Sequence, residues 1–369
     1  LRREPRPFFF TYMQRDSVCV TVVTYNSARF IRSCFESLLR QTYYPLEIVV
    51  VDNASQDSTL QELAPFRKRI RLIRNPRNAG FAEGQNQAIA ASRSDWVLTL
   101  NPDVQLEPNF IEKLVDAARI ESHVGTVCGK LLGLDDSLRP FDPPRIDSTG
   151  IYFTPSFRHF DRGWNEVDRD RYQRPEFVFG ACAAAALYRR EMIEDASLED
   201  GFFDPDFFIY REDADVAWRS QLLGWRCLYT PDAVGHHVRG LKPGPRSKVP
   251  ALVNMHSVKN RFLLRIKNAT ADVYRRHWLA MTGRDLLVIG GCLLQEPASL
   301  PAFWRLAKCF PRAVEKRRHI MARRRVTDQY LASWISDDPV SQPLAPAVSS
   351  SLAVASAGVR RDASARVLS

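Results

Sequence analysis

Three carboxylates share an apolar part of the sequence, the stretch "FFIYREDADVAWRSQLLGWRC" at residues 207–227. Glu212, Asp213 and Asp215 are accompanied there by two arginines, and aromatic side chains stand on both sides. A carboxyl group that loses contact with water holds its proton more tightly, so its pKa rises and it becomes a better base. Two interpretations follow. The segment is either a solvated start of a helix or a pocket that holds a general base.

Strand-like and helix-like segments alternate before this stretch. Buried, β-branched runs and amphipathic runs predict strands at 18–24, 47–53, 69–75 and 95–103, with helices at 28–41, 57–66 and 84–92. This alternation predicts an α/β fold in which about the first 110 residues form a parallel, doubly wound sheet.

Four polar segments stand where these strands end: "TYNS" (24–27), "DNAS" (52–55), "NPRNAG" (75–80) and "NPD" (101–103). Ligands of parallel sheets bind at the carboxyl ends of the strands. Each segment taken alone is also an ordinary polar turn or helix cap. Four of them at one edge indicate a binding site.

The composition is that of a soluble globular protein, with 45% hydrophobic and 25% charged residues. A net charge of +10 favours anionic partners, which include nucleotide phosphates, an anionic membrane surface and nucleic acid. The sequence has no helix-turn-helix, RNP or zinc pattern, so we expect no nucleic-acid partner.

Cysteine usage and the apolar runs favour a cytoplasmic protein. The seven cysteines are scattered and form no CxxC pair, which is typical of buried, reduced thiols. The N-terminal segment lacks the features of a signal peptide. The best apolar run, 285–294, falls short of the roughly 20 residues that cross a bilayer.

Six ordered segments resemble a known family: "VTVVTYNS", "VVVDNASQDST", "NAGFAEGQN", "LTLNPDV", "FFIYREDADVAWRSQLLGW" and "PDAVGHH". They occur in the order seen in family-2 inverting glycosyltransferases of the GT-A fold, and are most similar to bacterial rhamnosyltransferase-type enzymes of O-antigen and cell-wall glycan assembly. The resemblance covers about residues 17–270. It implies a Rossmann-like, mixed, mainly parallel sheet flanked by helices, with a helical C-terminal extension.

The resemblance, the helical pattern after residue 250 and the Ser-, Ala- and Pro-rich composition of the tail together predict a division of the chain. The expected parts are an N-terminal extension (1–16), a catalytic domain (17–250, with a nucleotide-binding half to about 110 and an acceptor half after it), a helical region (251–336) and a disordered tail (337–369).

A nucleotide-diphosphate sugar is the donor that the resemblance implies. The residues expected to line its base and ribose, or to approach the nucleotide and sugar, are Thr24, Tyr25, Asn26, Asp52, Asn53, Asn78, Gly80 and Asn86. A carboxylate such as Asp52 accepts two hydrogen bonds at once. The alternative for Asp52 is a helix cap, and the alternative for Gly80 is a plain left-handed turn.

Asn101-Pro102-Asp103 stands where the family has its DxD motif, which helps to hold Mg²⁺ or Mn²⁺ against the diphosphate. Asn101 replaces the first acid, so Asp103 is the anionic ligand that remains. His237 fits the family's spacing after "PDAVG" better than His236 does, and an imidazole is a suitable further ligand. The alternative is that Asn-Pro-Asp is only a turn.

Glu212-Asp213 matches the family's ED motif, in which the Asp is the general base. Direct displacement needs a carboxylate that removes the acceptor hydroxyl proton. We therefore expect Asp213 to be the base and Glu212 to orient the acceptor. Asp215 is expected to support the helix N-terminus, while Arg211 or Arg219 opposes the rise in the pKa of Asp213.

The acceptor is expected to be a glycan or a polyprenyl-diphosphate-linked glycan, and the donor a dTDP- or UDP-linked sugar, with dTDP-rhamnose first. Asp147, Arg158 and Asp161 lie in segments that resemble the acceptor side. The stretch 305–325 carries nine Lys and Arg residues among apolar ones. It indicates either a membrane-surface helix, which would place the protein on the inner face of the cell membrane, or a solvated helix face.

A different class of function is a catalytically inactive protein of the same fold that binds a nucleotide sugar or a glycan. The joint presence of Asp103, Asp213 and His237 favours the enzyme.

Overall fold

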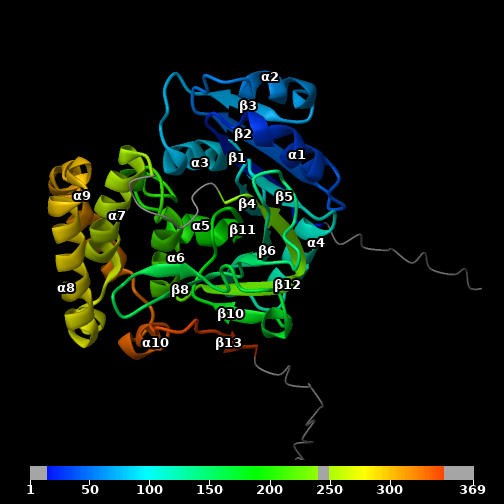
Figure 1. Ribbon diagram of the computed structural model, residues 1–369. Helices are drawn as coiled ribbons and strands as arrows, with labels where there is room; N and C mark the ends of the chain where they lie inside the picture. The colour runs from blue at the N-terminus through cyan, green and yellow to red at the C-terminus, as the bar shows by residue number, and fades with distance from the viewer. Residues whose placement is uncertain (1–14, 240–248, 345–369) are drawn as a thin grey trace, which may run out of the picture.

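The computed structural model describes residues 15–239 and 249–344. Figure 1 shows a sheet domain with a group of helices at one side. The strands are β1 (Val18–Thr24), β2 (Leu46–Asp52), β3 (Arg71–Arg74), β4 (Trp96–Leu100), β5 (Val104–Leu106), β6 (Val124–Gly133), β7 (Ile146–Ser148), β8 (Ile151–Phe153), β9 (His159–Asp161), β10 (Glu176–Val178), β11 (Ala185–Arg189), β12 (Arg226–His237) and β13 (Gln342–Pro343).

Helices follow most of these strands. They are α1 (Ala28–Leu39), α2 (Thr59–Leu63), α3 (Phe81–Ala90), α4 (Phe110–Ala118), α5 (Arg190–Ala196), α6 (Glu212–Leu222), α7 (Ala251–Asn268), α8 (Ala271–Leu294), α9 (Pro301–Ala322) and α10 (Asp328–Ala332). Short 3-10 helices are η1 (Ala64–Phe66), η2 (Asp170–Tyr172), η3 (Pro205–Phe207) and η5 (Pro297–Ser299).

The sheet has a parallel half and a mixed half. Its order across the described residues is β13-β10-β12-β6-β11-β4-β1-β2-β3. Strands β4, β1, β2 and β3 run parallel, as predicted for the first 110 residues. Strand β11 then lies antiparallel between β4 and β6 and so joins the second half, in which β12 runs parallel to β6. The predicted class, a mixed α/β sheet flanked by helices, is confirmed.

The apolar character of the central strands explains the position of the core. Strands β1 and β4 are buried along their whole length, which is typical of strands covered on both faces. The predicted strand at 95–103 ends at Leu100, and a separate short strand β5 follows the Asn-Pro-Asp turn. The helix expected at 84–92 begins earlier, at Phe81.

The ends of the chain differ in part from expectation. The tail was expected to be disordered from residue 337, but Gln342 and Pro343 pair with β10 as an edge strand. At the other end, the Asp16 carbonyl accepts a hydrogen bond of 2.6 Å from the Tyr43 hydroxyl. Residues 1–14, 240–248 and 345–369 of the predicted parts lie outside the described residues. All seven cysteines are free, as predicted.

The helical C-terminal region consists of α7, α8, α9 and α10. Helices α7 to α9 lie together at the side of the domain away from α1 and α2 (Figure 1). No single described helix is long and apolar enough to cross a membrane, and α8 with the segment Pro297–Ala322 meets that criterion only as a pair bent by 114°.

Buried ion pairs join α7 to the sheet domain. Lys267 of α7 is fully buried, contacts Asp204 and lies 2.9 Å from Asp215 of α6. Asn268 donates a hydrogen bond of 2.7 Å to the same Asp215 carboxylate, and Arg219 donates another of 2.9 Å. Burial alone would raise the pKa of Asp204, but Lys267 and Lys316 outweigh it and hold that pKa below its usual range.

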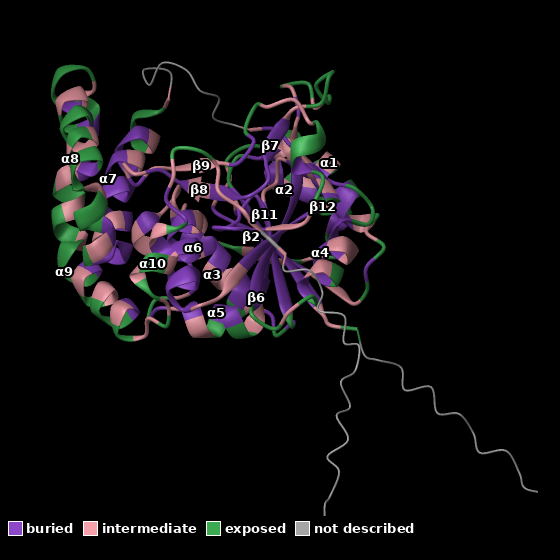
Figure 2. Ribbon diagram, turned by 90° about the horizontal axis from the view of Figure 1, so that it is seen from below, coloured by how far each residue is buried: buried purple, intermediate pink, exposed green. Residues whose placement is uncertain are grey.

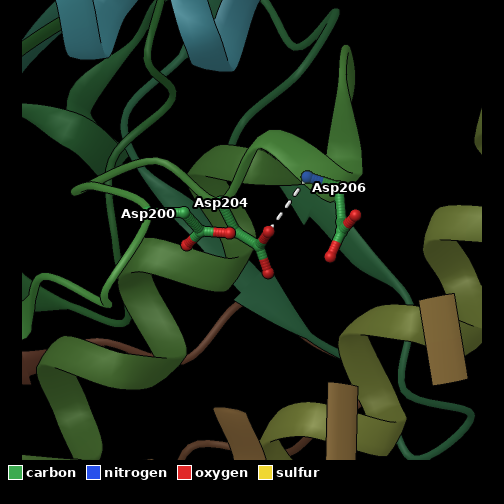
Figure 3. A group of neighbouring side chains, drawn as sticks. All are labelled: Asp200, Asp204 and Asp206. Atoms are coloured by element: carbon green, nitrogen blue, oxygen red, sulfur yellow. Dashed lines mark hydrogen bonds between the residues drawn. The ribbon is translucent and has the colours of Figure 1, made fainter. Parts of the chain in front are cut away.

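Asp200, Asp204 and Asp206 form an acidic group beside this junction, and Figure 3 shows their carboxylates close together. Three carboxylates at such spacing could hold a cation, but basic side chains of the C-terminal helices already occupy them. Lys316 of α9 lies 2.5 Å from Asp200, 2.7 Å from Asp204 and 3.1 Å from Asp206. Arg312 contacts Asp206 as well. The group is a structural junction between the loop before η3 and α9.

Much of the basic stretch 305–325 is used in such internal contacts. Besides Lys316 and Arg312, Arg317 donates to the carbonyls of Ile266 and Ala269. Further along, the basic residues that pair with Asp195 or Asp328 are Arg323, Arg324 and Arg325. Ion pairs and hydrogen bonds of this kind attach α9 to the rest of the structure. The stretch 305–325 therefore does not present all of its basic side chains to solvent.

We predict that Lys267→Met destabilises the protein by about 3–5 kcal/mol, because it leaves two buried carboxylates without their shared cation. The free energy of unfolding, from urea titration followed by circular dichroism, checks this. Arg275→Met is the control, because Arg275 is 80% exposed and pairs with Asp272 at the surface. It should cost less than about 1 kcal/mol. Equal effects of the two changes would contradict a central role for Lys267.

Candidate active site

A cavity of about 910 Å³ lies beside the carboxyl ends of β4 and β12. It is closed on one side by α7 and α8. The sequence-predicted residues that line it are Asn101, Asp103, Arg158, Asp161, Arg211, Glu212, Asp213 and His237. The cavity therefore brings the expected base and the expected metal ligands into one space.

Asp103 and His237 meet because of strand register. Strand β5 pairs antiparallel with β12, and His237 stands opposite Val104, the residue after Asp103. His237 Nε2 lies 3.4 Å from Asp103 Oδ1. On the other side of the ring, Nδ1 lies 2.8 Å from Asp147 Oδ2. Asp147 thus orients the imidazole with Nε2 toward Asp103.

This arrangement suits a divalent cation. Asp103 Oδ1 is buried and receives no hydrogen bond from the described residues. A metal-binding imidazole commonly has its other nitrogen held by a carboxylate, as Asp147 holds His237 here. Burial alone would lower the pKa of His237, but Asp147 and Asp103 outweigh it and raise the pKa to about 10, so Nε2 must lose its proton before it can bind a cation. The pair of carboxylates therefore attracts positive charge to this point.

Arg239, which the sequence did not single out, connects the acceptor-side carboxylates. Its Nε donates to Asp147 Oδ1 at 2.7 Å and its Nη2 to Asp161 Oδ2 at 2.6 Å. Asp147 and Asp161 are therefore held in one network, which continues through His237 to Asp103.

Glu212 and Asp213 occupy the first turn of α6 and face the cavity. Burial and the neighbouring Asp161 raise the pKa of Asp213 to about 6, although Arg211 opposes the rise. Burial and Asp213 itself raise the pKa of Glu212 to about 8. Near pH 7 Asp213 is ionised and Glu212 holds its proton. When the pKa values of two adjacent carboxyl groups differ in this way, one group can act as a base while the other donates a hydrogen bond.

The other acid and the other arginine of the motif have structural roles. Asp215 is fully buried and points to Arg219 and Lys267. It joins α6 to α7, which goes beyond the expected support of a helix N-terminus. Arg219 also donates to the carbonyls of Ala196 and Phe202. Arg211 is the arginine that lowers the pKa of Asp213, against the rise that burial causes.

The loop that precedes α6 has an unusual backbone. Phe208, Tyr210 and Arg211 all have positive φ values, of 65°, 68° and 72°. Non-glycine residues in this region cost about 1–3 kcal/mol each, and they persist only where surrounding contacts fix them. These contacts come from α7, where Asn260 Nδ2 donates to the carbonyls of Phe207 (2.8 Å), Ile209 (2.9 Å) and Tyr210 (2.8 Å).

Thr24, Asp52 and Asn53 lie at the adjacent ends of β1 and β2, where Thr24 stands opposite Asp52 in the parallel register. Asp52 is buried and accepts hydrogen bonds from the hydroxyls of Thr24 (3.0 Å) and Ser55 (2.6 Å). It holds the turn after β2 and does not cap α2, whose N-cap is Ser58. These three residues do not line the cavity, and their nucleotide contacts stay a prediction.

Tyr25 and Asn26 follow at the same edge. The Tyr25 side chain is exposed. Asn26 has a φ of 51°, and its Oδ1 accepts a hydrogen bond from the Gln56 amide at 2.8 Å. Both residues are on the surface beside the β1 end, where a planar base could lie on the tyrosine ring.

Gly80 connects Asn53, at the end of β2, with the loop that precedes α6. Its carbonyl accepts from Asn53 Nδ2 at 2.9 Å, and its amide donates to Asn78 Oδ1 at 2.9 Å. A Cβ at Gly80, where φ is +88°, would lie 2.6 Å from the Phe208 carbonyl oxygen. That oxygen accepts from the Phe81 amide at 2.7 Å. Only glycine allows so close an approach with this backbone conformation.

Asn86 does not reach the cavity. Its Nδ2 donates to the carbonyls of Asp200 and Phe203, and its Oδ1 accepts from the Phe203 amide at 2.9 Å. Gly201 lies against the same side chain. The amide group of Asn86 fixes the loop of residues 200–203, and its approach to the donor stays a prediction.

A mixed, mainly parallel sheet flanked by helices is the arrangement of the GT-A fold. Residues 19–196 match the model of "Glycosyl transferase family 2". The chain therefore carries a family 2 glycosyltransferase domain, and the protein is a glycosyltransferase. The predicted family is confirmed.

Curated relatives and a solved structure agree with this class. The chain is 28% identical over 237 residues to an N-acetylglucosaminyl-diphospho-decaprenol L-rhamnosyltransferase of Mycobacterium tuberculosis (strain ATCC 25618 / H37Rv), which covers 60% of this chain and 76% of that protein. It is 29% identical to the succinoglycan biosynthesis protein ExoO of Rhizobium meliloti (strain 1021), over 60% of this chain and 61% of that one. The crystal structure of GalNAc-T7 superposes with a TM-score of 0.54 at 16% identity, over 69% of this chain and 48% of its own.

We predict that Asn260→Ala lowers kcat by up to about 100-fold, because the loop that places Asp213 loses the donor holding three of its carbonyls. Donor affinity, measured by titration calorimetry, should change little, since Asn260 does not line the cavity. Leu252→Ala, at an exposed position of the same helix, is the control and should leave kcat unchanged. A parallel loss of donor affinity and kcat would contradict a positioning role.

Proposed function

We propose that the protein transfers a sugar, rhamnose first, from a dTDP- or UDP-linked donor to a glycan or polyprenyl-diphosphate-linked acceptor, with inversion at the anomeric carbon. The observation that carries the proposal is the position of Asp213. It lines the same cavity as Asp103 and His237 and has its pKa raised to about 6 by burial.

The proposed chemistry follows from Asp213 on one part of the cavity wall and from Asp103 and His237 on another. Asp213, ionised near pH 7, takes the proton of the acceptor hydroxyl as that oxygen bonds to the anomeric carbon. The bond from the anomeric carbon to the diphosphate breaks, and the nucleoside diphosphate leaves with the electron pair. Glu212 holds its proton near pH 7, so it can donate a hydrogen bond that orients the acceptor.

Asp103 and His237 would hold the divalent cation. Mg²⁺ or Mn²⁺ bound there would neutralise charge on the diphosphate. GalNAc-T7, which shares the fold, was crystallised with UDP, GalNAc and Mn²⁺. Asn101 also lines the cavity, and as a neutral amide it leaves Asp103 as the anionic ligand of the Asn-Pro-Asp turn.

Two arginines that line the cavity support an anionic acceptor. Arg158 and Arg284 both line the cavity, and no carboxylate contacts either within the described residues. Arg284 Nε is buried without a hydrogen-bond partner there. Burial and then the charge of Arg284 lower the pKa of Arg158. Two desolvated guanidinium groups of like charge favour a phosphate or diphosphate between them.

A lipid-diphosphate acceptor agrees with the named activity of the mycobacterial relative, a rhamnosyltransferase acting on an N-acetylglucosaminyl-diphospho-decaprenol. For this chain the acceptor and the donor sugar are part of the proposal.

We predict that Asp213→Asn abolishes sugar transfer while donor binding persists, since the amide cannot take a proton. The measurement is nucleotide release from dTDP-, UDP- and GDP-sugars with and without Mg²⁺ or Mn²⁺, beside calorimetric donor binding. In the unchanged enzyme kcat should fall as the pH drops below about 6, where Asp213 becomes protonated, and level off above it.

Asp116→Asn is the control for that change, because it removes an exposed carboxylate on α4. It should keep full activity. Binding without turnover in the unchanged protein would indicate the catalytically inactive alternative, and no binding of any nucleotide sugar would overturn the proposal.

We predict that Arg284→Gln raises the KM for a lipid-diphosphate acceptor by about 10- to 100-fold, because a charge-assisted hydrogen bond to phosphate is lost. Release of nucleotide from the donor by water should be unchanged. Arg284→Lys should recover part of the affinity. Arg32→Gln, at an exposed position of α1, is the control. An equal rise in KM for a neutral sugar acceptor would argue against an anion site.

A further inference from the structure

The outward side of α8 exposes a row of leucines. Leu279, Leu286, Leu287, Leu293 and Leu294 are between 60% and 85% exposed. Their spacing places them on one side of the helix, opposite the buried Met281, Val288 and Cys292. Figure 2 shows α8 at the outer edge of the molecule with exposed residues along it. Exposed leucines at this density on one helix mark an interaction surface.

Nothing in the described chain covers this row, which we call the α8 outer face. Side chains added at Gly283, Gly290 and Gly291 would meet no atom within 4 Å. Between Leu279 and Leu294 the charged residues are Arg284 and Asp285, and both are used on the inner side. Arg284 lines the cavity, and Asp285 pairs with arginines of α7. The α8 outer face is therefore apolar and offers no hydrogen-bonding side chain of its own.

Aromatic and basic side chains border the α8 outer face at both ends. Exposed Tyr274 and Trp278 stand at its N-terminal end, and exposed Trp304 follows the turn at its C-terminal end. Lys308 Nζ lies 3.5 Å from the centre of the Trp304 ring. Tryptophan, tyrosine and basic residues beside an apolar helix face are typical of helices that lie at a membrane surface.

The charges favour an anionic partner. The exposed basic residues of α8 and α9 include Arg275, Arg276, Arg305 and Lys308, whereas Glu315 is the exposed acid of these two helices. Asp272 offsets Arg275 and Arg276 in part. A second copy packed on the same face would still bring two sets of basic residues together, with Glu315 as the exposed acid on each. An anionic lipid surface offsets them and accepts the leucines in its apolar layer.

We propose that the α8 outer face docks on an anionic phospholipid bilayer, with the leucines at the level of the acyl chains and the basic residues at the headgroups. The proposed docking surface lies on α8, whereas the sequence analysis indicated the basic stretch 305–325 as the membrane-surface helix. Since Arg284 and Val288 on the inner side of α8 line the cavity, docking would bring the acceptor side of the cavity next to the lipid. This last step rests on the proposed lipid-linked acceptor, but the docking surface does not.

Vesicle flotation of the full chain tests the proposal. Wild type should float with vesicles of equal parts phosphatidylglycerol and phosphatidylethanolamine, more weakly with pure phosphatidylcholine, and less at 1 M salt. The double change Leu286→Glu and Leu287→Glu should lower the floated fraction at least 10-fold. Both side chains are exposed, so folding should not suffer, and circular dichroism melting checks this. Ile120→Glu, an exposed position far from α8, is the matched control and should float as wild type.

Three results would overturn the proposal. They are no flotation of wild type, equal flotation of the double variant, or a wild-type dimer in light scattering that the double variant loses, which would assign the face to a second copy. Nucleotide release in the absence of vesicles separates this proposal from the proposed function. It should be the same in wild type and the double variant whether or not they bind lipid, and its absence in both would count against the transferase chemistry alone.

Discussion

The buried contact between Lys267 and the carboxylates of Asp204 and Asp215 is the constraint on which the rest of the site depends. Asp215 belongs to the helix that begins with Glu212 and Asp213, so the position of α7 and the position of the base are determined by the same ion pairs. Two charges removed from water persist only when each is fully partnered. Here Arg219 and Asn268 complete the partners of Asp215. The C-terminal helices are thus part of the active site's framework.

A second consequence of this framework is electrostatic. Asn260 on the same α7 holds the loop with positive φ values, and this loop turns α6 so that Glu212 and Asp213 enter the cavity side by side. Burial raises the pKa of both carboxyl groups, and their repulsion ensures that they do not ionise together. The proposed roles of Asp213 as base and Glu212 as hydrogen-bond donor therefore depend on a backbone conformation that α7 fixes.

The parallel half of the fold and the core of the site were predictable, because both depend on local signals. The β-branched runs at 18–24 and 47–53 predict strands, and the polar segments after them mark the edge where ligands bind. The motif of Glu212 and Asp213 is contiguous and could be recognised directly. By contrast, Asn260 and Arg239 act through contacts with residues 50 and 78 positions away, for which the sequence has no spacing signal. The hydrogen bonds of Asn86 go to the backbone of residues 200–203, a contact that the sequence could not predict because these residues are distant along the chain.

The contact of Gly80 with Phe208 has a consequence for recombination between relatives. The Phe81 amide and the Phe208 carbonyl form one hydrogen bond of 2.7 Å across the two halves of the domain. The space at Gly80 is too small for any Cβ, so the two segments fit each other at the level of the backbone. A chimera that takes its nucleotide-binding half from one enzyme and its acceptor half from another would need to inherit the turn at 78–82 and the loop at 207–211 from the same parent. To exchange donor specificity between relatives, the turn at 78–82 and the loop at 207–211 would therefore have to be transferred together.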